Sequence, residues 1–170
     1  MVFMANEIEG LDEVIARMRE LGEPRKVKNA ATRSARKAMN IVRKAAIENA
    51  KGLDDKDSSN RIWKNIITKP SKTKGYGYLM MRVGVKGGAR KYPNTAPNRR
   101  KGVVGQTYET GGSSKNSGGD TWYWRFLEYG SASNSATPFL RPALNNNKGA
   151  AEAEFKRSFS EELDKEIAKL

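Results

Sequence analysis

The spacing of apolar side chains predicts two amphipathic helices in the first third of the chain. In residues 8–21 apolar side chains recur three and four positions apart, and Gly22, followed by Pro24, provides an end to the helix. In residues 25–51 the apolar positions, most of them alanine, fall within one sector about 100° wide. Because alanine lets a neighbouring element come close, this second helix is expected to lie against a sheet or another helix, with Gly52 as its cap.

A third helix is predicted for residues 143–170. Its apolar side chains recur at a spacing close to four, at Ala151, Phe155, Phe159, Leu163, Ile167 and Leu170. The sequence NNNKG at 145–149 could kink or split this helix. The same helix carries carboxylates whose spacing is typical of a solvated face, at Glu161, Glu162, Asp164 and Glu166.

Alternating apolar and polar positions predict strands between the helices. Residues 76–86 alternate most clearly. The apolar residues within 62–67 fit a helical turn or a strand, and we favour a turn that runs into a strand ending before Pro70. Residues 121–130 concentrate aromatic side chains and are expected to form a second core segment, as a strand or a strand passing into a helical turn, with Gly130 at its end.

Residues 87–120 show little periodicity and are dense in glycine, proline, serine and asparagine. A structureless loop of this length is uncommon inside a compact domain, so the segment is expected to be either a flexible arm or a long β-hairpin. Together the elements predict a single α+β domain over residues 1–170. A small antiparallel sheet would be packed by the long helix 25–51 and by the C-terminal helix.

Charged residues are distributed unevenly along the chain. The net charge is +13, and nearly all of it lies between residues 23 and 120, whereas residues 1–22 are net acidic and residues 121–170 are balanced. Such a basic middle is typical of a protein that binds a polyanion or docks on an acidic partner. Solubility is the plainer interpretation of the same charge.

Two groups of cations are candidates for contact with a partner or with DNA. The first lies on helix 25–51 opposite its apolar sector, at Arg33, Arg36, Lys37, Arg43 and Lys44. The second lies in the segment 87–120, at Arg90, Lys91, Arg99, Arg100 and Lys101. Three interpretations stay open for the helix: non-specific contact with phosphate, docking on an acidic neighbour, or a solvated face. The aromatic side chains of 121–130 could stack on bases, but their density is more typical of a core.

The amino-acid types argue against an enzyme. The chain has no histidine and no cysteine, which excludes a histidine base, a cysteine nucleophile, disulfides and Cys/His zinc sites. It also has no phosphate-binding glycine motif, and no apolar run approaches the length of a membrane span. We therefore expect neither a cofactor nor a metal.

Residues 123–144, YWRFLEYGSASNSATPFLRPAL, carry the most specific pattern in the chain. The pattern resembles a signature of tailed-phage neck proteins, whose positions here are Tyr123, Phe126, Glu128, Tyr129, Gly130, Pro138, Phe139, Leu140, Arg141 and Pro142. The order of the upstream helices and strand fits as well. The chain thus resembles the gene-product-ten-like family of Hong Kong 97-type phages. It departs from the family pattern in Ser131, where threonine is commoner, and in the length of segment 87–120.

The signature makes physical sense as a structural element. Gly130 permits the positive φ of a sharp reversal. Glu128 is a lone acid among aromatic side chains, and a buried unpaired carboxylate costs several kcal/mol, so we expect it to bond to Arg141 or to backbone amides. The two prolines of the signature stiffen the path so that Phe139 and Leu140 fill the core.

The resemblance implies a structural virion protein of the neck or of tail completion. It would be a ring-forming subunit, a hexamer or dodecamer, that joins the head connector to the tail around the DNA channel. The implied partners are copies of itself, head-completion and portal-adaptor proteins, and the tail terminator or tail tube, with non-specific contact with packaged DNA as an option. Its place would be the head–tail junction, and the host cytoplasm during assembly.

The alternative function is a free basic nucleic-acid-binding protein. It shares the charge but does not explain the Pro-Phe-Leu-Arg-Pro-Ala segment. In a junction ring, DNA must slide past the subunits, and each neutralised phosphate tightens the grip. Most of the helix stripe is therefore expected to dock on protein, with only part of the segment 87–120 facing the channel.

Overall fold

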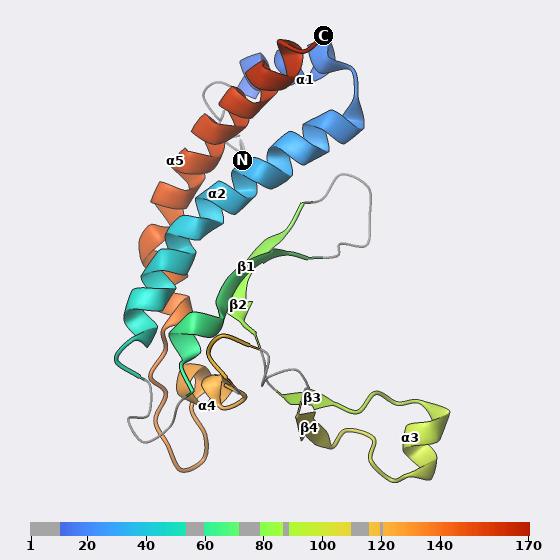
Figure 1. The fold of residues 1–170 in the computed structure, drawn as a ribbon, viewed down its shortest axis with the longest axis vertical. Coiled ribbons are helices and arrows are strands. Elements are labelled where there is room, and N and C mark those ends of the chain that lie inside the picture. The colour runs from blue at the N-terminus through green and yellow to red at the C-terminus, as the bar shows by residue number, and fades with distance from the viewer. Residues whose placement is uncertain (1–10, 54–59, 72–78, 87–88, 110–115, 120) are drawn as a thin grey trace, which may run out of the picture.

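The computed structural model describes most of the chain, namely residues 11–53, 60–71, 79–86, 89–109, 116–119 and 121–170. Two long helices dominate it, α2 (Pro24–Ala50) and α5 (Leu140–Ile167), which run side by side in opposite directions (Figure 1). The shorter helix α1 (Leu11–Leu21) packs mainly against α5. None of the described helices is long and apolar enough to span a bilayer.

Small side chains let the two long helices approach closely. On α2 the buried positions recur every four residues, at Ala30, Ser34, Ala38, Val42, Ala46 and Ala50. On α5 the buried positions are Ala143, Ala151, Ser158, Phe159, Glu162 and Leu163. The predictions of helices 25–51 and 143–170 are confirmed, and α5 passes through the NNNKG sequence as one continuous helix. Leu170 was expected in the apolar stripe but lies exposed beyond the end of α5.

The helix ends differ in part from the sequence prediction. Gly22 ends α1 with φ +60° and donates to the carbonyl of Arg19, as expected. Pro24 is the first residue of α2, a position where its missing N–H costs nothing. The expectation that Gly52 caps α2 is wrong: the helix ends at Ala50, and its cap is Lys51 in a right-handed conformation. No left-handed residue is needed there, because the chain continues in a helical turn.

A two-stranded antiparallel sheet lies across α2. A 3-10 turn (Ile62–Asn65) leads into β1 (Ile66–Pro70), which pairs with β2 (Met81–Val85). The predicted turn followed by a strand is therefore confirmed, although the strand includes Pro70 at its end. Two side chains of α2 hold β1: Arg43 Nε donates to the carbonyl of Ile66 at 2.8 Å, and Asn40 Oδ1 accepts from the Thr68 hydroxyl at 3.1 Å.

Within the segment 87–120, residues 89–109 form a β-hairpin whose strands have three residues each, which is shorter than the long hairpin expected as one of the two alternatives. β3 (Ala89–Lys91) pairs with β4 (Thr107–Glu109), and a short helix, α3 (Ala96–Arg100), lies between them. Figure 1 shows this hairpin, here called the arm, projecting away from the long helices. We call residues 92–106 the arm tip.

The aromatic segment is helical, not extended. Residues 124–129 form α4 (Trp124–Tyr129), so the expected strand within 121–130 is wrong, whereas the helical turn ended by Gly130 is present. The expected core role is also wrong for three of its aromatic side chains: Trp122, Phe126 and Tyr129 are 41%, 48% and 66% exposed. A helix divides the segment between two faces, so that Tyr123, Trp124 and Leu127 pack on the core while the other aromatic residues point outward.

Candidate functional site

The signature residues form a joint between α4 and the start of α5. The Glu128 side chain is 1% exposed and ends directly at the first amides of α5. Its Oε2 accepts from the backbone N–H of Phe139 at 2.8 Å and of Leu140 at 2.9 Å. Its Oε1 accepts from the N–H of Arg141 at 3.0 Å and from Arg141 Nε at 3.2 Å. A carboxylate in this place satisfies amides that the helix leaves unpaired and matches the positive end of its dipole.

The expectation that Glu128 bonds to Arg141 or to backbone amides is confirmed, and both partners are used. The Arg141 guanidinium also donates to the carbonyl of Glu128 and lies over the Tyr129 ring at 5.2 Å. The chain then reverses at Gly130, whose φ is +79°, as predicted. A side chain there would meet the backbone nitrogen of Ala136 at 3.1 Å.

The loop that follows is fastened to α4 and, at its end, to α2. Thr137 N–H donates to the carbonyl of Leu127 at 2.7 Å, and Asn49 of α2 donates to the carbonyl of Phe139 at 3.1 Å. Phe139 is fully buried, as expected, whereas Pro138 is exposed and Pro142 lies in the first turn of α5. The joint is thus a structural device, in which the side chains of Glu128, Arg141 and Asn49 bind backbone groups of neighbouring segments.

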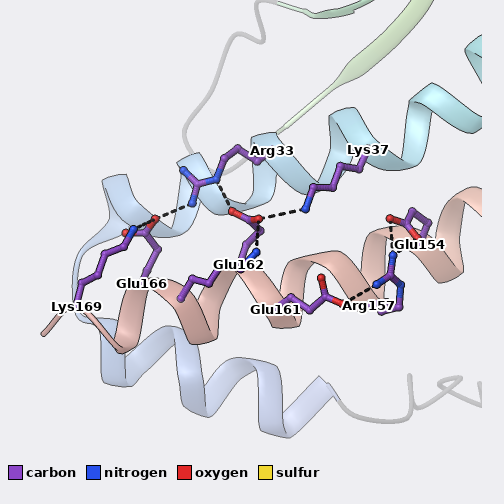
Figure 2. Close-up of polar contacts among 9 residues, drawn as sticks. Arg33, Lys37, Glu154, Arg157, Glu161, Glu162, Glu166 and Lys169 are labelled. Carbon is purple, nitrogen blue, oxygen red and sulfur yellow. Dashed lines mark hydrogen bonds and ion pairs between the residues drawn. The ribbon is translucent and has the colours of Figure 1, made fainter.

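Two cations of the helix stripe are used inside the chain. Figure 2 shows Arg33 and Lys37 of α2 reaching across to α5. Arg33 Nε lies 2.5 Å from Glu162 Oε2, its Nη2 lies 2.7 Å from Glu166 Oε1, and Lys37 Nζ lies 3.2 Å from Glu162 Oε1. These contacts bind α2 to α5 beyond their apolar faces.

The hydrogen bond from Arg33, together with those from Lys37 and Lys165, lowers the pKa of Glu162 to about 2, against the opposing effect of its burial. The pKa of Glu166 is lowered as well, chiefly by Arg33. The expected solvated face of α5 is therefore wrong for Glu162, whose side chain is only 9% exposed. The spacing of residues within α5 does not reveal that α2 presents cations to the side of α5 that carries Glu162.

These ion pairs make the stability of the helix pair depend on pH. The folded pKa of Glu162 lies below its usual value of about 4.5, so the stabilisation is complete above that value and is lost as pH falls through about 2. We expect Glu162→Gln to cost about 1–2 kcal/mol at pH 7, since Arg33 and Lys37 are half exposed and screened, and to cost less at pH 3. Urea unfolding midpoints at the two pH values measure this. Equal losses at both would contradict the assignment.

The remaining cations of the stripe differ in their surroundings. Arg43 binds β1, as described above. Arg36 and Lys44 are exposed, and in the part of the chain that the structure describes neither has an ion pair or a hydrogen bond from its side chain. Of the five candidate residues on α2, these two are the ones left available to an outside partner.

The arm carries the other candidate cations. Arg90 and Lys91 belong to β3. Arg99 lies in the last turn of α3 with its guanidinium 2.8 Å from Asn94 Oδ1. The exposed residues Arg100, which ends α3, and Lys101 follow it at the tip. The structure thus places the cations of the arm apart from those of α2, so the two groups form separate surfaces.

An aromatic surface that the sequence pattern did not predict lies on α4. We call it the α4 face and define it by Trp122, Phe126, Tyr129 and Arg125. The rings of Trp122 and Phe126 meet edge to face at 5.8 Å, and Arg125 lies over Trp124 at 5.5 Å. The three exposed aromatic residues are spaced by four and then three positions. That helical spacing was a visible signal, but it was assigned to a core segment. Trp, Tyr and Arg are the residue types that dominate protein–protein interfaces.

The described residues contain no cluster of three or more acidic side chains that could hold a metal ion. A family model, described as "HK97-gp10_like: Bacteriophage HK97-gp10, putative tail-component", matches residues 12–130, which is well over half of the chain. The match includes α4 and Gly130 and stops before the Pro-Phe-Leu-Arg-Pro-Ala segment. No curated protein and no solved structure matches the chain.

Proposed function

The chain belongs to the HK97-gp10-like family of bacteriophage tail components, and from this premise we propose that it is a ring-forming subunit at the head–tail junction. In this role it closes a hexameric or dodecameric ring around the DNA channel, with the head-completion or portal-adaptor proteins on one side and the tail terminator or tail tube on the other. Its function is structural, without catalysis.

The α4 face is the observation that carries the proposal. A chain that buries its core between α2, α5 and the small sheet nevertheless leaves three large aromatic side chains exposed beside Arg125. Exposed aromatic side chains of this kind are typical of a surface that another protein covers. A contact between the α4 face of one copy and a different surface of the next copy would be heterologous, which is the geometry that closes rings.

Removing the α4 face is expected to prevent ring assembly. Trp122→Ser with Phe126→Ser removes two exposed side chains, each expected to contribute about 2 kcal/mol to the contact, or about 30-fold in affinity. Light scattering on the purified protein should show a discrete ring for the parent chain and a monomer for the double variant.

The matched control removes two exposed apolar side chains elsewhere. Met80→Ser with Leu170→Ser is expected to leave the ring intact, because these residues are 51% and 71% exposed and lie far from α4 in the sequence. In cells infected by a phage that lacks this gene, heads and tails should accumulate unjoined, and joined particles in their usual number would overturn the proposal. A parent protein that is monomeric at every concentration would equally count against a self-closing ring.

A further inference from the structure

Among the described side chains, many cations have no ion pair, whereas the carboxylates all do. Every carboxylate whose side chain the structure describes takes part in an ion pair. Many exposed cations in the same described regions have none, among them Arg25, Lys28, Arg36, Lys44, Arg100 and Lys101. The described side chains of a second copy therefore offer these cations no carboxylate that is free of an ion pair.

The arm tip is where this charge is most concentrated. Arg99, Arg100 and Lys101 are consecutive, and residues 92–106 contain no acidic residue. Arg100 and Lys101 are exposed, and in the described chain their side chains make no ion pair or hydrogen bond. The tip stands clear of the two long helices (Figure 1). A cationic group that projects in this way can reach a partner that the body of the subunit does not touch.

The composition of the tip fits a nucleic acid backbone better than a protein. Apart from the three cations, residues 92–106 are asparagine, threonine, glutamine, glycine, proline and alanine, together with Tyr92, Val103 and the exposed Val104. The large exposed aromatic side chains of the described chain lie on the α4 face instead. Protein interfaces are depleted of lysine and rich in aromatic residues, whereas Arg, Lys, Asn and Thr are the usual ligands of phosphate oxygens. The two surfaces thus differ in the kind of partner that they suit.

We propose that the arm tip binds the phosphodiester backbone of duplex DNA through Arg100 and Lys101, with Arg99 beside them. The contact is independent of base sequence and weakens as salt rises, because each neutralised phosphate releases counterions. It rests on the proposed function only in identifying the duplex as the phage genome. If only the arm binds DNA, the rest of the ring wall makes no contact with phosphate, so that DNA can still slide through the ring.

The test measures binding of the full chain to a labelled 30-base-pair duplex over a salt series. Arg100→Ala with Lys101→Ala is expected to weaken binding about tenfold at low salt and to reduce the slope of log affinity against log salt by about 2. The matched control, Arg25→Ala with Lys28→Ala, removes the same charge from the start of α2, where the side chains are equally exposed. It should bind within about twofold of the parent with an unchanged slope.

Three results would overturn the proposal: no binding by the parent chain, equal losses in the two double variants, or a normal DNA affinity in an arm variant that fails to join heads to tails. The last result would assign the tip to an acidic protein. Unfolding midpoints equal to that of the parent exclude misfolding of either variant. Because this assay uses the free chain, its failure leaves the ring assay unaffected. DNA binding by a chain that forms no ring would instead favour a free nucleic-acid-binding protein.

Discussion

Replacing Glu128 by alanine is expected to lower the free energy of unfolding by about 3–5 kcal/mol. The substitution removes the acceptor for three backbone amides at the start of α5 and leaves the Arg141 guanidinium without its carboxylate. Because domains are stable by only about 5–15 kcal/mol, this is a large share of the total. Urea unfolding at pH 7, followed by circular dichroism, measures the loss as a shift in midpoint.

Two further variants separate the geometry of the site from the loss of a charge. Glu128→Gln keeps the shape of the side chain but replaces one of its two acceptor oxygens by an NH₂ group. That group would face N–H donors and could not accept from them, so we expect the free energy of unfolding to fall by about 2–3 kcal/mol. Glu152→Ala breaks only an exposed pair with Lys156 and should cost at most about 0.5 kcal/mol. If Glu128→Gln were as stable as the parent, the joint would not depend on two acceptor oxygens.

The joint is the part of the site that sequence reasoning predicted best. Glu128 was recognised as an acid that needs partners, and Gly130 as a reversal, since both requirements follow from the residue type alone. The partners lie within thirteen positions of Glu128 along the chain. Because these partners are close to Glu128 along the chain, few arrangements of the segment between them are possible.

The helix stripe was harder to predict because its partners lie far away along the chain. Helical periodicity placed Arg33 and Lys37 on one face of α2, but Glu162 follows them by more than a hundred residues. The sequence of neither helix specifies how α2 and α5 are rotated about their own axes when they pack together. The α4 face was hard to predict for a similar reason. A run of aromatic residues has the same sequence pattern whether its side chains enter the core or contact another protein.

The arm was predicted in outline only. Its little periodicity and its many glycines and prolines left open whether the segment is a flexible arm or a long β-hairpin that pairs with itself. After the arm, the chain lies against the body of the protein at residues 116–119 and 121, here called the return path. There Asn65, which is 1% exposed, donates to the carbonyl of Gly119 and to the Thr121 hydroxyl, both at 2.9 Å. Such a set of contacts between distant segments has no local signal in the sequence.

Gly118→Ala is expected to destabilise the protein by about 3 kcal/mol, because it forces this return path apart. A methyl group at Gly118 would lie 2.1 Å from the carbonyl oxygen of Arg61 and 2.8 Å from the Asn65 side chain. The same residues are joined by hydrogen bonds that any shift would stretch: Gly118 N–H to Asn65 Oδ1 at 2.9 Å, and Arg61 N–H to the Gly118 carbonyl at 2.8 Å. The urea midpoint at pH 7 gives the change.

Gly149→Ala is the matched control and should change stability in the opposite direction. Gly149 lies inside α5, and a methyl group there meets no atom within 4 Å. Alanine in a helix interior is favoured over glycine by about 0.5–1 kcal/mol, so the midpoint should rise. A loss confined to Gly118→Ala would show that the base of the arm is held by close backbone packing. Equal behaviour of the two variants would mean that the return path can relax around a side chain, and that the arm is attached more loosely than these contacts imply.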